Sequence, residues 1–79
     1  MTEIGIVAGA ILILLEEKNI PVSVAEIKCL MDEPADLIDM SLGWLIRENY
    51  VRVIRGGEKY SALVPNMVSA IAIEELQNV

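Results

Sequence analysis

The order of elements between residues 22 and 60 constrains the fold of this chain more than any other feature of its sequence. The string Ser23-Val24-Ala25-Glu26 is a capping box, in which the Ser23 hydroxyl can accept from the backbone N–H of Glu26 while the Glu26 carboxylate reaches back to the N–H of Ser23. Val22 and Ile27 stand where a hydrophobic staple would close around this box. The pattern therefore predicts a helix that begins at residue 24 and runs to about residue 31, with Ile27, Leu30 and Met31 inward.

A second helix is expected directly after the acidic turn Asp32-Glu33-Pro34. Proline suits the first position of a helix because its missing N–H would be unpaired there anyway. We expect this helix to run from Pro34 to about residue 49, with an apolar face made of Ile38, Leu42, Leu45 and Ile46. The opposite face, at spacings of three and four, carries Asp36, Asp39, Met40, Gly43 and Arg47.

A β-hairpin follows the second helix. Residues 51–55 and 58–64 are rich in β-formers, with Val51 and Val53 on one side and Arg52 and Ile54 on the other. Gly56-Gly57 between them permits the positive φ of a tight hairpin turn. We also expect residue 22 to add a short strand beside this hairpin.

Two helices followed by a two-stranded hairpin is the order of a winged helix-turn-helix. The sequence therefore predicts a mainly α fold with a small β-hairpin, in which a three-helix core carries the wing. We expect one domain over residues 1–79, with residues 1–64 as its core and residues 65–79 as an additional C-terminal segment. The sequence of that segment leaves helix and strand open.

The chain resembles a small uncharacterised winged helix-turn-helix domain family of bacteria and archaea over residues 3–60. The strings that carry the resemblance are Glu3-Ile4-Gly5-Ile6-Val7-Ala8-Gly9, Pro21-Val22-Ser23-Val24-Ala25-Glu26-Ile27 and Met40-Ser41-Leu42-Gly43-Trp44-Leu45-Ile46-Arg47-Glu48. The resemblance implies the fold and a regulator-like role. It implies no catalytic motif and no ligand.

The N-terminal helix is expected from residue 3 to about residue 18, capped by Thr2, and it is apolar nearly all round. It could be a central core helix, with Gly5 and Gly9 allowing close packing. We favour the alternative that one face packs on the domain and the other on a second subunit, because so small a domain cannot cover a helix on every side. The expected homodimer interface consists of Ile4, Ile6, Val7, Ile13, Met67 and Ile71.

Several function classes are disfavoured by what the chain lacks. It has no His and a single cysteine, Cys29, so it can form neither an internal disulfide nor a Cys/His zinc site. The apolar run of residues 4–15 is shorter than the ~20 residues of a membrane span, and the start Thr2-Glu3 lacks the basic residues of a signal peptide. We expect a cytoplasmic protein without cofactor, metal, small-molecule substrate or membrane association.

No pattern in the sequence predicts catalysis. Asp36 and Asp39 could face the same way as a carboxylate pair, but a solvated acidic helix start explains them more simply. Cys29 lies beside Lys28 in sequence, yet side chains one residue apart on a helix diverge, so Lys28 would not activate the thiol. We therefore predict that the protein is not an enzyme.

The charge pattern restricts how such a domain could bind DNA. The net charge is −6, and residues 1–50 hold nine acids against three bases. The second helix offers no Arg, Lys, Asn or Gln before Arg47, so direct reading of bases by this helix is disfavoured. DNA contact is expected instead from Arg47 and the wing residues Arg52, Arg55 and Lys59, unless the wing bases pair with acids of the neighbouring helices.

The sequence thus predicts a winged-helix domain of the DNA-binding, transcription-regulator type that acts as a homodimer and binds DNA weakly and in a salt-dependent way. The alternative is a protein–protein docking or dimerisation module without specific DNA binding.

Overall fold

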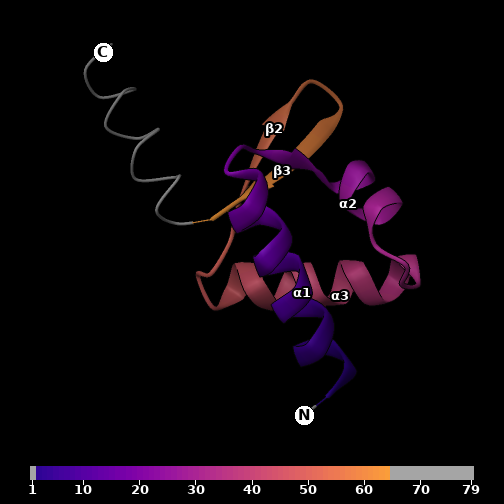
Figure 1. The fold of residues 1–79 in the computed structure, drawn as a ribbon. Helices are drawn as coiled ribbons and strands as arrows, with labels where there is room; N and C mark the ends of the chain where they lie inside the picture. The colour runs from indigo at the N-terminus through magenta and orange to yellow at the C-terminus, as the bar shows by residue number, and fades with distance from the viewer. Residues whose placement is uncertain (1, 65–79) are drawn as a thin grey trace.

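The structure, a computed structural model, describes residues 2–64; residue 1 and residues 65–79 lie outside the described part. Its elements follow in the order α1 (Glu3–Lys18), β1 (Val22–Ser23), α2 (Val24–Leu30), α3 (Ala35–Arg47), β2 (Arg52–Gly56) and β3 (Lys59–Leu63) (Figure 1). Three helices and a small antiparallel sheet confirm the winged helix-turn-helix fold predicted from the sequence. The predicted C-terminal segment, with Met67 and Ile71, falls outside the described residues.

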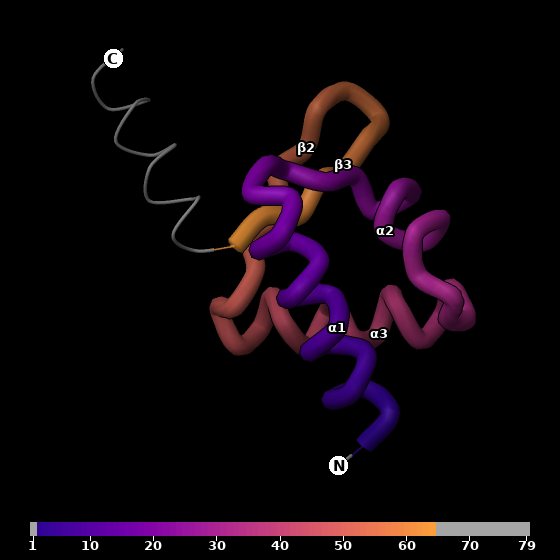
Figure 2. Tube along the Cα trace, in the orientation of Figure 1, coloured from indigo at the N-terminus to yellow at the C-terminus, as the bar shows by residue number. Residues whose placement is uncertain are grey.

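Helix α1 begins and ends through local capping. The Thr2 hydroxyl accepts from the N–H of Gly5 at 3.1 Å, which pairs one of the free donors of the first turn. Asn19 closes the other end with a left-handed φ of 53° and donates its N–H to the carbonyl of Leu15 at 3.0 Å. Figures 1 and 2 show that α1 crosses α3, and these two helices make the main helix–helix contact of the domain.

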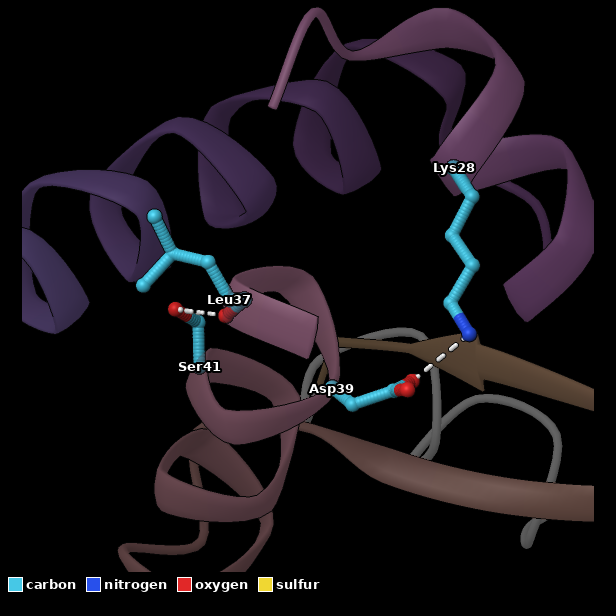
Figure 3. Close-up of polar contacts among 4 residues, drawn as sticks. All are labelled: Lys28, Leu37, Asp39 and Ser41. Carbon is cyan, nitrogen blue, oxygen red and sulfur yellow. Dashed lines mark hydrogen bonds and ion pairs between the residues drawn. The ribbon is translucent and has the colours of Figure 1, made fainter. Parts of the chain in front are cut away.

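A buried serine marks the crossing of α1 and α3. Ser41 is fully buried, and its hydroxyl lies 2.7 Å from the carbonyl oxygen of Leu37 and 3.4 Å from that of Ile4. The hydroxyl hydrogen is thus satisfied within α3 (Figure 3), while the longer contact faces the first turn of α1. A small side chain at this point lets the two helix backbones approach each other.

The predicted capping box is present at the start of α2, where the Ser23 hydroxyl accepts from the N–H of Glu26 at 3.0 Å. Val22 and Ile27, the predicted staple, are both buried. Helix α3 begins one residue later than expected, because Pro34 is its N-cap residue rather than its first helical residue. It ends at Arg47, two residues before the predicted end, since Asn49 takes a φ of 64° and turns the chain into the wing.

The sheet has the strand order β1-β3-β2, so the last strand is central. The short strand predicted beside the wing is β1, whose Val22 is the register partner of Ala62. The hairpin turn differs from the prediction by one residue. Gly56 still pairs with Lys59 as the last residue of β2, and the loop consists of Gly57 and Glu58, with Gly57 at a φ of 64°.

The core lies between α1, α3 and the inner face of the sheet. Its largest fully buried side chains are Ile11, Leu15, Ile27, Ile38, Leu45, Leu63, Val22 and Val51. Two expected core residues are not in it: Leu30 is 50 % exposed and Ile46 is 41 % exposed. Leu30 is the last residue of α2, where no element of residues 2–64 covers it, and Ile46 borders a groove.

Candidate functional site

The outer face of α3 is the surface that would enter a DNA groove, and it is acidic and apolar. Asp36, Asp39, Met40 and Gly43 are all exposed there. Asp39 is bound by Lys28 of α2, whose Nζ lies 2.8 Å from Oδ1 (Figure 3). The face therefore presents no hydrogen-bond donor side chain suited to a base edge before Arg47 at the end of the helix.

The cations that the sequence analysis assigned to DNA contact are all exposed. These residues are Arg47, Arg52, Arg55 and Lys59. Within residues 2–64, none of them has a side-chain nitrogen within 4.0 Å of a carboxylate oxygen. In this part of the chain, the wing bases thus remain available to an external anion instead of pairing with the acids of the helices.

Arg55 is the most firmly positioned of these cations. Its Nε donates to the carbonyl of Gly57 at 3.0 Å, and its guanidinium carbon lies 5.7 Å from the ring centroid of Tyr60. Tyr60 is also its register partner across the hairpin. The turn and the aromatic ring thus hold Arg55 near the tip of the wing, while the residue remains exposed.

The strand register divides the wing cations between two faces. Arg55 shares its face with Val53 and Tyr60, because register partners and alternate residues lie on the same side of a sheet. By the same rule, Arg52 and Lys59 belong to the opposite face. A hairpin with cations on both faces can touch phosphates with either side, but it does not form one continuous basic stripe.

A groove of about 440 Å³ separates the outer side of α3 from the wing. Its mainly apolar lining comes from β1 and the start of α2, from α3, and from the hairpin with its loop. The lining residues are Ser23, Val24, Ala25, Asp39, Leu42, Gly43, Ile46, Val53, Glu58, Lys59 and Tyr60. The apolar pattern of the sequence placed Ile46 in the core, and periodicity alone could not indicate that this side chain is partly exposed beside a groove.

Two aromatic residues lie on the surface near the end of α3. Trp44 and Tyr50 are 44 % and 49 % exposed, and their rings stack at 5.9 Å between centroids with an interplanar angle of 23°. They pack on each other at the end of α3 and leave one side of each ring to solvent.

The outer face of α1 is apolar and open. Ile6 and Ile13 are 57 % and 58 % exposed, and a Cβ added at Gly9 would meet no atom within 4 Å. The predicted dimer residue Val7 does not belong to this face: it is 3 % exposed and packs in the core of its own domain, so we remove it from the expected interface. Ile4 is half-buried at the crossing with α3.

Within residues 2–64, no group of three His, Cys, Asp or Glu side chains could hold a metal ion. Cys29 is exposed on α2, and the Asp39 carboxylate forms an ion pair with Lys28. None of the helices in the described part is long and apolar enough to cross a membrane.

Comparison with protein families gives a match over most of the chain. The model of the family described as winged helix-turn-helix domain (DUF2582) matches residues 1–63. No curated protein and no solved structure matches the chain.

Proposed function

This chain belongs to that winged helix-turn-helix domain family, and we propose that it works as a homodimeric, regulator-like domain that contacts DNA through its wing. The observation that carries this proposal is the exposure of Arg52, Arg55 and Lys59 without a carboxylate partner within residues 2–64. The acidic face of α3 argues against base reading by the helix, so the contact is made to phosphates. Contacts to phosphates alone discriminate little between one DNA sequence and another.

The charges set the expected strength of such binding. Each phosphate neutralised by a cation adds about 0.9 to the slope of log K against log salt concentration. Three wing cations and Arg47 in each subunit allow a steep salt dependence, while the net charge of −6 per chain opposes association. We therefore expect binding that is measurable at low salt and is largely lost at about 0.15 M salt.

The test is a titration of mixed-sequence duplex DNA at several salt concentrations, followed by fluorescence anisotropy. Arg52→Ala with Arg55→Ala should abolish binding, and each single substitution should lower the salt slope by about one unit per lost contact. Lys18→Ala is the matched control, because it removes one charge from α1, away from the wing. Absence of binding by the unmodified protein at every salt concentration would refute the proposal.

A second candidate function, protein docking, is favoured by one observation: the groove between α3 and the wing is lined mainly by apolar side chains. A phosphate backbone does not fill such a surface, whereas the side chains of a protein partner do. If this is the function, Ile46→Glu should abolish capture of a partner from the native cell. Ile54→Glu, which alters an isoleucine of similar exposure on the other face of the wing, should leave capture intact.

The homodimer is the remaining part of the proposal. The exposed Ile6 and Ile13 on α1 support it, and Met67 and Ile71 stay in the proposed interface on the sequence argument alone. Analytical ultracentrifugation at micromolar concentration tests it directly. A mass of 8.7 kDa, that of one chain, would contradict it.

A further inference from the structure

We propose that the stacked pair of Trp44 and Tyr50 is a platform for an unpaired nucleobase, so that the domain binds single-stranded nucleic acid where α3 leads into β2. This site lies apart from the wing tip, and it does not depend on contact between the wing and duplex DNA. It gives a role to two exposed aromatic rings that the proposed phosphate contacts do not use.

The turn after α3 fixes the two rings against each other. Asn49 takes a left-handed φ of 64°, and the N–H of Tyr50 donates to the carbonyl of Leu45 at 2.9 Å. These features fold the chain back at the end of α3, where the ring centroids of Trp44 and Tyr50 lie 5.9 Å apart. The two rings are therefore held in place before a ligand arrives, which lowers the entropy cost of binding.

The exposed ring pair offers a surface on which a third ring can stack. Trp44 and Tyr50 both keep a large part of their side chains accessible to solvent. Every nucleobase has a flat π face, and stacking of bases on exposed aromatic side chains is a common basis of binding to single strands. The bases of a duplex are already stacked on one another, so only an unpaired base can use the platform.

Two arginines flank the aromatic pair. Arg47 follows Trp44 by three positions on α3, which makes the two side chains neighbours on the helix surface. Arg52 follows Tyr50 by two positions, and both are exposed while Val51 between them is buried. In the described part of the chain, neither arginine has a carboxylate oxygen within 4.0 Å. Both cations are thus available to the phosphates of a strand whose base is stacked there.

Glu48 is the acid closest in sequence to this platform, and its charge opposes the phosphates. It lies four positions after Trp44, and in the part of the chain that the structure describes it forms no ion pair. We therefore expect weak, salt-dependent binding, with a slope of about 0.7 per neutralised phosphate in the plot of log K against log salt concentration. Glu48→Gln should tighten the binding.

The test uses the fluorescence of Trp44, which is the single tryptophan of the chain. An oligodeoxythymidine of about ten nucleotides is titrated into the full chain at low salt, and an oligouridine of equal length separates DNA from RNA as the source of the base. We expect the emission of Trp44 to fall with either strand or with both, because a base stacked on the indole ring quenches it. Binding with unchanged emission would overturn the inference.

Variants separate stacking from charge. Trp44→Ala should weaken binding of a labelled oligodeoxythymidine, measured by anisotropy, by about 5- to 150-fold, the loss expected for one stacked base. Trp44→Phe keeps an aromatic ring and should retain most of the affinity. Ile20→Ala is the control, because it truncates an exposed apolar side chain between α1 and β1. Equal affinities of Trp44→Ala and the unmodified protein would contradict the platform.

A duplex of the same length distinguishes this inference from the function proposed above. Trp44→Ala should leave duplex affinity almost unchanged, whereas Arg55→Ala at the wing should weaken the duplex more than the single strand. Quenching by a single strand without any duplex binding would refute the wing contact and keep the platform. Duplex binding without affinity for a single strand would refute the platform alone, and absence of both would refute both.

Discussion

Lys28 on α2 and Asp39 on α3 form an ion pair with 2.8 Å between Nζ and Oδ1. The pair joins the two helices of the helix-turn-helix and partly neutralises the acid at the centre of the outward face of α3. Both side chains are partly exposed, so the pair stabilises the fold only modestly, by about 0–1 kcal/mol. Its larger consequence is electrostatic, because it reduces the repulsion between α3 and any approaching anion.

Lys28→Met should therefore weaken DNA binding more than it weakens the fold. The substitution keeps most of the apolar stem but leaves the Asp39 carboxylate without its cation. We expect a change in unfolding free energy below about 1 kcal/mol and a clear loss of low-salt DNA affinity. Lys18→Met on α1 also removes one positive charge, and it should lower the DNA affinity less than Lys28→Met does. Equal affinities of the two variants would mean that Asp39 does not face the DNA.

Asp36→Asn combined with Asp39→Asn should tighten non-specific DNA binding, because two negative charges leave the surface next to the wing. The control is Asp32→Asn with Glu33→Gln, which changes the net charge equally in the turn before α3. Mobility shifts with the two double variants separate a local effect from a net-charge effect. Loss of sequence-specific binding on replacing Asp39, with unaffected wing variants, would instead show direct reading by α3.

Ser23→Ala should destabilise the domain by about 1 kcal/mol, because the N–H of Glu26 loses its acceptor at the start of α2. In a domain of this size, that corresponds to a fall in melting temperature of about 4–8 °C. Ser23→Asp retains an acceptor at the cap position and should keep most of the stability. Circular dichroism melts of the three proteins check this, and equal melts would contradict the role of the cap.

Gly57→Ala should destabilise the wing, while Gly56→Ala should not. An added Cβ meets no atom within 4 Å at either position, so space does not distinguish them. Only Gly57 has a left-handed φ, 64°, which costs an alanine about 1–2 kcal/mol. Chemical denaturation of the two variants measures the difference. A similar loss at both positions would mean that the turn is centred on Gly56 and Gly57, as the sequence pattern first indicated.

The sequence predicts best what neighbouring residues determine. The caps at Thr2 and Ser23 each depend on a donor three residues away, and both are present in the structure. Prediction from the sequence fails where the position or burial of a side chain depends on distant segments of the chain. The periodicity placed Ile46 in the core, but whether an apolar side chain is buried depends on what covers it, and the wing leaves a groove there instead.

The residues of the candidate site show the same difference between features set by neighbouring residues and features set by distant segments. The sequence indicated which cations the wing carries, but it left open whether they pair with acids of the neighbouring helices. The pairing of Lys28 with Asp39 could not be predicted, because it depends on the angle between two helices joined by a turn. Val7 was placed on the wrong face of α1 because the helix is apolar all round, and its pattern does not indicate which side the domain covers.

The central position of β3 makes the wing and the helix-turn-helix one mechanical unit. Ala62 pairs with Val22 on one side and with Val53 on the other, and the residue after Val22 caps α2. A force applied at the wing tip is thus transmitted through β3 to the start of α2. The base of the wing, where Ser61 and Ala62 pair with β1, therefore cannot swing as a separate flap. We expect slower hydrogen exchange at residues 61 and 62 than at the outer residues 59 and 60, which are paired only within the hairpin.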